Sequence, residues 1–502
     1  MSQHYGTVIS TFDSPSTRKF CFTVNKDTVV HRGQFVQLDV VDGKLVGRIS
    51  DIFKTNRYFM RPESVNEVAK SGRQMDWDYP VWEHEYLVAE ASALGVFDKS
   101  GQKKESTFPP SPGTKVFEPE QKILFDFFGL DPEGLHLGKL AFHDVDVRLN
   151  TTRLLQKHMA ILAISGAGKS YFTSVLLEEL LNRDPEKGQI ATVIIDPHGE
   201  YSHFLDDPKF AGKVKVFKAS EIRIGLPNLS THQLVKFAPD ASSGVQVREL
   251  NRVIRDMEEE AYGLDELIVA VEKDEKVKSA TKDVLISLLE NLKYTGLFSI
   301  ADYPSLEETA RQGEVTILDL SKEVNLHNKQ IITAYIAKKL FDARRDGIIP
   351  PFLLVVEEAH QFAPEKSQKH TAVCKGIIET IAREGRKFHA SLCLISQRPV
   401  QLSTTSLSQC NTHIILRVTN PYDLKHIAES SESITNSVLR QIAGLQVGTG
   451  MIVGEAVNSP IFVKIRGRES KVTSSKGMSL EKAAVEYYKR IAQKKKDAKG
   501  FM

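Results

Sequence analysis

The stretch Ala163 to Ser170, "AISGAGKS", decides the fold of this chain. It follows the apolar run "HMAIL" and precedes the helix-like run "YFTSVLLEELLNR", so it lies between a predicted strand and a predicted helix. Small residues let successive backbone N–H groups curl around phosphate oxygens, and a helix N-terminus adds the positive end of its dipole. We therefore predict a nucleotide-binding loop made of Ser165, Gly166, Ala167, Gly168, Lys169 and Ser170.

The loop matches the pattern GxxxxGK[ST] except that Ala163 stands in place of the first glycine. That position makes only the first turn of the loop, and alanine accommodates the turn at negative φ. Lys169 is expected to reach the β- and γ-phosphates, and the Ser170 hydroxyl is expected to bind Mg²⁺. ATP and Mg²⁺ are thus the predicted cofactors.

A second stretch, "FLLVVEE", ends an apolar run of strand type in Glu357 and Glu358. Adjacent like charges at the edge of a core are unfavourable unless a cation or a reaction uses them. A P-loop ATPase needs one carboxylate beside its metal ion and another to polarise the attacking water. We assign Glu357 to the metal side and Glu358 to the general base. The alternative is that one of them only pairs with a lysine or arginine.

Three further positions favour hydrolysis. Gln397 follows a buried strand-like run, where its amide can sense the γ-phosphate. Arg383 and Arg386 lie three residues apart on a predicted helix, and hence on one face. An exposed arginine there suits a finger that completes the active site of a neighbouring subunit. The alternative is an ordinary helix salt bridge to Glu379 or Glu384.

The motif "VIIDPHGEY" ends another predicted strand with Asp196, His198 and Glu200, which we place at the margin of the site. No CxxC or HExxH pattern is present, so a zinc ion held by the protein is not expected.

Length and composition set the wider frame. A chain of 502 residues exceeds what one hydrophobic core can organise. The net charge of +2 does not indicate a nucleic-acid-binding surface on the chain as a whole. The four cysteines are expected to be buried, reduced thiols. The N-terminus lacks an apolar signal core and no apolar run reaches the ~18 residues of a membrane span, so we expect a cytoplasmic protein with no membrane partner.

Pattern changes along the chain predict several parts. The first hundred residues alternate as strands do, with Phe20, Phe22 and Val24 on one face, and Asp42-Gly43 marks a hairpin. Later apolar runs alternate with helices, which predicts a largely parallel sheet. The fold class expected is α/β, a P-loop ATPase core with a small N-terminal β-barrel and an inserted helical bundle. The predicted boundaries are a barrel at 1–105, a linker at 106–125, the core at 126–227 and 301–475, the bundle at 228–300 and a basic C-terminal helix or tail at 476–502.

In their order and spacing, the motifs resemble the HerA family, hexameric DNA translocases of the HerA–FtsK branch of RecA-like ATPases. The residues that carry the resemblance are "KHMAILAISGAGKS", "VIIDPHGEY", "VVEEAHQFAPE", "AREGRKF" and "SQRPVQLS". Nearly the whole chain is covered, the N-terminal region being similar to the family's barrel. The departures are Ala163 for glycine and Glu357 for aspartate. The resemblance implies a hexameric ring that moves double-stranded DNA independently of sequence. It also implies DNA end resection for recombinational repair with a nuclease of the NurA type, for which the N-terminal barrel is a candidate contact.

The residues alone support less: ATP and Mg²⁺ binding, with hydrolysis. No basic stripe with interleaved aromatic residues marks a DNA surface. Two alternatives stay open, a ring motor of the same fold that moves another cargo and a nucleotide-gated scaffold. Intact Lys169, Glu358 and Gln397 argue against the scaffold.

Overall fold

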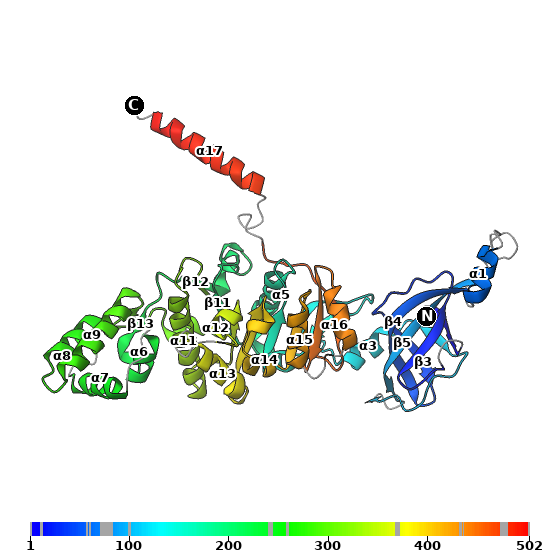
Figure 1. Cartoon of the computed structure of the whole chain (residues 1–502), viewed down its shortest axis with the longest axis horizontal. Coiled ribbons are helices and arrows are strands. Elements are labelled where there is room, and N and C mark those ends of the chain that lie inside the picture. The colour runs from blue at the N-terminus through cyan, green and yellow to red at the C-terminus, as the bar shows by residue number, and fades with distance from the viewer. Residues whose placement is uncertain are drawn as a thin grey trace.

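The computed structural model describes residues 3–10, 14–56, 59, 62–70, 84–98, 102–238, 244–257, 261–366, 372–430, 434, 436–471 and 480–499. Figure 1 shows the N-terminal barrel at one end, a sheet with its helices in the middle and a helical insertion at the other end. The C-terminal helix α17 (Leu480–Lys499) projects away from these three parts. Of the predicted tail, residues 476–479 and 500–502 lie outside the described residues.

The N-terminal domain is a closed antiparallel barrel. Its strands are β1 (His4–Ile9), β2 (Lys19–Val24), β3 (Phe35–Val40), β4 (Gly43–Asn56), β5 (Glu85–Phe97), β6 (Lys103–Lys104) and β7 (Lys115–Phe117). They follow the order β2-β1-β7-β3-β4-β5-β6, and an added β2–β5 pairing closes the ring, with β6 attached outside it. Phe20, Phe22 and Val24 point into the barrel core, as their alternation predicts.

Residues 106–125, which the sequence predicts to be a linker, instead contain β7 and the start of helix α3 (Gln121–Phe128). Strand β7 pairs with β1 and β3, and Val116 is fully buried. Three residues are too few to show a strand's alternation, so the surrounding Ser, Pro and Gly dominate the local pattern. Helix α3 joins the barrel to the next domain, because the rings of Phe128 and Phe35 lie 4.8 Å apart.

The central domain is built on one mixed sheet of eleven strands, in the order β12-β15-β11-β16-β17-β10-β18-β19-β20-β8-β9. The neighbouring strands from β12 to β18 are parallel, and those from β18 to β9 are antiparallel. This confirms the predicted α/β fold class with a mainly parallel sheet. The strands are β8 (Leu135–Leu140), β9 (Asp146–Leu149), β10 (Met159–Leu162), β11 (Ala191–Asp196), β12 (Val214–Lys218), β15 (Val315–Asp319), β16 (Phe352–Val356), β17 (Ala390–Ser396), β18 (Thr412–Ile415), β19 (Thr449–Gly454) and β20 (Ile461–Ile465).

Both faces of this sheet are buried, which explains the continuous apolar strands. In β16, Leu353 and Val355 pack in one core cluster, while Phe352, Leu354 and Val356 pack in the other. Helix α5 (Lys169–Asn182) covers the first face. The second face is covered by α11 (Leu326–Arg345), α13 (Lys375–Glu384) and α15 (Pro421–Glu429).

The stretch predicted as an inserted bundle, 228–300, is helical. It contains α6 (Thr231–Phe237), α7 (Gly244–Asp256), α8 (Leu264–Lys273) and α9 (Ser279–Tyr294). At its base the short strands β13 (Ile224–Gly225) and β14 (Phe298–Ser299) pair in parallel. Other helices lie in connections: α1 (Pro62–Lys70), α4 (Thr151–Leu155), α10 (Leu306–Thr309), α12 (Ala359–Phe362), α14 (Thr404–Ser408) and α16 (Asn436–Ala443).

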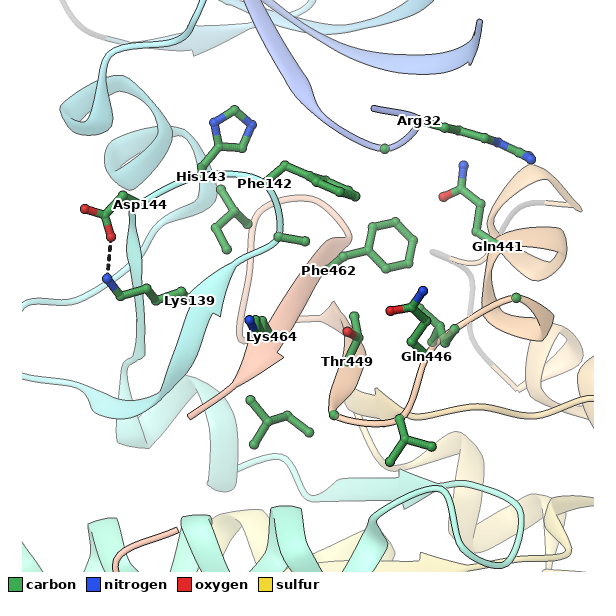
Figure 2. A pocket seen from close by; sticks show the side chains of 18 of the residues that line it. Arg32, Lys139, Phe142, His143, Asp144, Gln441, Gln446, Thr449, Phe462 and Lys464 are labelled. Atoms are coloured by element: carbon green, nitrogen blue, oxygen red, sulfur yellow. Dashed lines mark hydrogen bonds and ion pairs between the residues drawn. The ribbon is translucent and has the colours of Figure 1, made fainter. Parts of the chain in front are cut away.

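A cavity of about 950 Å³ lies where the barrel meets the antiparallel end of the sheet. Figure 2 shows Phe142, Phe462, Arg32 and Gln441 of α16 among the side chains that line it. None of the residues from Ser165 to Ser170 lines this cavity, so it is separate from the predicted nucleotide loop.

Two further predictions concern the cysteines and membrane-spanning helices. All four cysteines are free and buried, as the sequence predicts. Within the described ranges, no helix combines the length and the apolar character needed to cross a membrane.

The buried position of β7 makes a stability prediction. We expect Val116→Ala to lower the free energy of unfolding by roughly 2 kcal/mol, because it removes buried methyl groups from the barrel core. Lys115→Ala, an exposed neighbour on the same strand, is the matched control and should leave stability almost unchanged. Denaturant unfolding of the whole chain measures both. Equal stability of the two variants would show that the segment does not contribute to the barrel core.

Candidate active site

The predicted nucleotide loop follows β10 at the carboxyl edge of the sheet. The backbone N–H of Ala163 donates to Ser396 O over 3.2 Å, and that of Ile164 donates to Arg417 O over 3.0 Å. These bonds continue the sheet beyond β10 and fix the start of the loop. Ala163 is fully buried and is not among the positive-φ residues, so alanine fits the place where the pattern has glycine.

Two glycines shape the rest of the loop. Gly166 has φ 75° and Gly168 has φ 101°, a region that other residues rarely adopt. A Cβ built on either glycine would point into open space, with no atom beyond the chain neighbours within 4 Å. Gly168 caps α5, whose first N–H groups have no partner within the helix. The loop therefore has the geometry of an anion site.

Glu358 stands at the centre of the site. It is 3% exposed and has left-handed backbone angles, φ 48° and ψ 44°, which cost about 1–3 kcal/mol in a residue other than glycine. Lys169 Nζ lies 3.5 Å from its Oε1, and Gln397 Nε2 donates a hydrogen bond to the same oxygen. His360 Nδ1 lies 3.4 Å from its Oε2. Lys169, Glu358 and Gln397 are predicted site residues that lie far apart in the sequence. The structure brings Lys169 and Gln397 into contact with Glu358.

Glu357 lies beside it in a different environment. Its Oε1 accepts a hydrogen bond from the hydroxyl of Tyr201, a residue with no exposed surface. Burial raises the pKa of Glu357 to about 8, and the charges of Glu200 and Glu358 act in the same direction. At neutral pH this carboxyl group therefore holds its proton unless a further cation approaches.

The turn after β11 supplies Glu200 and Tyr201, which both act on Glu357. Asp196 is fully buried and accepts hydrogen bonds from the backbone N–H groups of His198 (3.2 Å) and Tyr201 (3.0 Å). Burial raises the pKa of Asp196. The carboxylate of Glu200 accepts a hydrogen bond from Ser170 Oγ. We therefore find Asp196 shaping the turn, while Glu200 reaches the loop itself.

Oxygen ligands for Mg²⁺ meet at this point. Ser170 contacts Glu200, and the charge of Glu200 acts on Glu357, so a hydroxyl and two carboxyl groups are neighbours. Mg²⁺ prefers such oxygen ligands and commonly completes its shell with water and substrate phosphates. Within the described residues, no group of three or more His, Cys, Asp or Glu side chains forms a metal cage. The donor set fits an ion held jointly with a nucleotide.

The two predicted arginines lie elsewhere. Arg383 lies in the last turn of α13 and Arg386 lies in the following 3-10 turn (Gly385–Phe388); both are exposed. This turn precedes β17, whereas Gln397 follows it, so the arginines lie some 20 Å from Gln397 at about 3.3 Å per strand residue. In the parts of the chain that the structure describes, neither arginine forms an ion pair, so the alternative salt bridge is not present there.

Sequence reasoning missed two contacts of the site and one supporting residue. Tyr201 and His360 contact the two glutamates, and Ser396 Oγ lies 3.2 Å from His360 Nδ1. The available signals were weak. Tyr201 ends the motif "VIIDPHGEY", where a buried hydroxyl needs a partner, and His360 comes two residues after Glu358.

Comparisons with known proteins find relatives along most of the chain. A family model described as "Helicase HerA, central domain" matches residues 135–340. The "Probable DNA double-strand break repair helicase HerA" of Methanocaldococcus jannaschii is 31% identical over 457 residues, covering 76% of this chain and 85% of the relative. The "DNA double-strand break repair helicase HerA" of Saccharolobus solfataricus is 27% identical over 501 residues, covering 94% of each. VirB4 of Thermoanaerobacter pseudethanolicus shares the fold, with a TM-score of 0.51 and 16% identity over 68% of this chain and 98% of VirB4.

The raised pKa of Glu357 makes a pH prediction. Between the ordinary carboxyl pKa and about 8, the folded chain holds a proton that the unfolded chain releases, so this group's contribution to stability falls as pH rises. We expect Glu357→Gln to remove that loss and to melt at a higher temperature than the unaltered protein at pH 8, with a smaller difference at pH 5.

Thermal melting at both pH values, with chelator and without nucleotide, measures this. Glu365→Gln, which changes a carboxylate outside this cluster, is the control. A Glu357→Gln variant whose advantage does not grow with pH would contradict the assignment of a buried, protonated carboxyl group.

Proposed function

The chain belongs to the HerA family of helicases, and from this we propose that it is a motor that hydrolyses ATP to move along double-stranded DNA in the repair of DNA breaks. Membership of a helicase family makes it an ATP-hydrolysing enzyme. The observation that best supports the chemistry is the convergence of Lys169, Gln397 and His360 on the buried carboxylate of Glu358.

ATP binding would rest on the loop from Ser165 to Ser170. The backbone N–H groups of the loop would hold the phosphates, and Lys169 would reach the β- and γ-phosphates. In the structure Lys169 pairs with Glu358 at 3.5 Å. A γ-phosphate in the loop would compete for this lysine, which would leave Glu358 free to act on water while Gln397 and His360 keep it in place.

Glu358 is proposed as the general base that orients and deprotonates the attacking water. Gln397, on the adjacent strand end, would sense the γ-phosphate. Burial lowers the pKa of His360, which favours a neutral imidazole that positions the Glu358 carboxylate. Because all of these groups lie at one buried sheet edge, their electrostatic effects are only weakly screened by solvent.

Mg²⁺ would be held by Ser170 and Glu357 together with the phosphates, and when bound it would offset negative charge on the transferred phosphoryl group. The carboxylate of Glu200, already in contact with Ser170, is a further candidate for this shell or for its water.

Arg383 and Arg386 support a ring. They lie at the sheet edge opposite Glu358, so a finger role requires the active site of a second copy. Head-to-tail contacts between identical subunits form a ring when the rotation between them closes, and the family resemblance implies a hexamer. DNA contacts in such a ring would go to phosphates and would not depend on base sequence. We also propose a nuclease partner of the NurA type that docks through the N-terminal barrel and resects DNA ends.

The proposed function is tested by steady-state ATP hydrolysis with and without linear double-stranded DNA, at two salt concentrations. We expect DNA to stimulate hydrolysis and the stimulation to fade at high salt, because phosphate contacts release counterions. Supercoiled, end-free DNA and an unrelated linear sequence distinguish dependence on ends from dependence on sequence.

Glu358→Gln is the control for this measurement. It should still bind ATP but lose hydrolysis by roughly a hundredfold or more, since the general base is absent. Hydrolysis that ignores DNA at both salt concentrations would instead favour a motor with another cargo. ATP binding without any turnover would favour the nucleotide-gated scaffold.

The proposed finger makes a separate prediction. Arg383→Ala or Arg386→Ala should lower hydrolysis by roughly a thousandfold, and mixing with inactive Lys169→Ala chains should restore part of it. In a mixed ring, a Lys169→Ala chain supplies the arginine to an intact loop in its neighbour. Lys387→Ala, an exposed cation beside Arg386, is the matched control and should keep full activity. Absence of rescue in mixed rings would exclude a finger that acts between subunits.

A further inference from the structure

The chain that leaves β20 crosses the outer face of helix α5; we call residues 466–471 the C-terminal strap. Glu178 of α5 has no exposed surface and holds the strap through both carboxylate oxygens. It accepts hydrogen bonds from Arg466 Nη1 (2.8 Å), Glu469 N (3.0 Å), Ser470 N (2.8 Å) and Ser470 Oγ (2.6 Å). A buried carboxylate satisfied by so many donors fixes the strap firmly on the helix.

At its near end the strap meets Tyr171, the third residue of α5. The Tyr171 hydroxyl donates to Arg466 O over 3.3 Å and accepts from Arg468 N over 2.8 Å. The Arg468 guanidinium carbon lies 6.0 Å from the centroid of the Tyr171 ring. Tyr171 is nevertheless 39% exposed as a residue, so the strap contacts it without covering it completely.

One donor of Arg468 is left over. Its Nε donates to Ser470 O at 3.1 Å, whereas Nη2 is buried and has no hydrogen-bond partner among the described residues. Buried donors are normally paired, and an unpaired one calls for an explanation. Because this atom has almost no accessible surface, the guanidinium would have to turn to present it to a ligand acceptor.

We propose that Tyr171 and Arg468 form the wall against which the base and ribose of bound ATP rest. The inference depends on the proposed nucleotide loop. Tyr171 directly follows Ser170, so the nucleoside attached to the α-phosphate leaves the loop over the first turn of α5. Aromatic rings and guanidinium groups both stack on flat bases.

The geometry also sets the kind of selectivity. Both hydrogen bonds of the Tyr171 hydroxyl go to the strap backbone, so the ring offers the base its apolar face rather than a polar contact. The wall should therefore favour nucleosides over bare phosphate chains, and purines over the smaller pyrimidines. It should discriminate only modestly between ATP and GTP, because stacking depends on the area of the base more than on its hydrogen-bonding groups.

The test compares the binding of ATP and of inorganic tripolyphosphate to the full chain by calorimetry, in the presence of Mg²⁺. We expect Arg468→Ala and Tyr171→Leu to weaken ATP binding about tenfold and to leave tripolyphosphate binding within about twofold. Arg468→Lys keeps the charge but loses the flat guanidinium, so it should behave like Arg468→Ala. Lys209→Ala, which removes an ion pair to Glu469 at the far end of the strap, is the matched control and should bind both ligands normally.

Unchanged tripolyphosphate binding also reports that each variant is folded. Equal weakening of both ligands would place Arg468 on the phosphates and overturn the inference, as would unchanged ATP binding in all three wall variants. Failure of the nucleotide loop itself gives a different result. In that case the unaltered protein would bind neither ligand, or Lys169→Ala would not weaken either.

Discussion

Three carboxyl groups, Glu200, Glu357 and Glu358, share a largely buried site with one lysine, Lys169. Charges in such surroundings are stable only when they are paired, hydrogen-bonded or neutralised. The structure uses each of these means: Lys169 and Gln397 contact Glu358, Ser170 contacts Glu200, and Glu357 keeps its proton beside Tyr201. A cation brought to Ser170 would favour the ionised form of Glu357, so cation affinity and this pKa are thermodynamically linked.

The order of the strands separates this charged edge from the other end of the sheet. Strand β17 lies between β10 and β16 and spans both edges, with the arginine-bearing turn before it and Gln397 after it. Parallel pairing on both sides fixes its register, because Leu394 is paired with Ala160 and with Val356. The distance between the two edges is therefore set by one rigid strand. The two predicted arginines and Glu358 are kept apart in this way within one chain, so the proposed finger role needs a second copy.

Sequence reasoning worked where the signal is local. The loop and the two glutamates follow apolar strands directly, and the central sheet shows itself in continuous Ile, Leu and Val runs. It did not work where distant segments meet. Tyr201 and Glu357 are 156 residues apart, and the sequence near either residue does not predict the hydrogen bond between them. Strand β7 is only three residues long and lies among turn-forming residues, so the barrel boundary was placed too early.

The strap adds a mechanical constraint to this picture. Helix α5 makes contacts at two places. Its first turn contains the end of the predicted nucleotide loop, and Glu178, two turns further along, holds the strap through hydrogen bonds. Releasing the strap would break all of the hydrogen bonds between Glu178 and residues 466–471 at once, so we expect strap and helix to move together. Helix α17 starts nine residues after Lys471, so it begins within about 30 Å of this anchor. The last described residues before the C-terminal helix are thus held against α5, the helix that follows the predicted nucleotide loop.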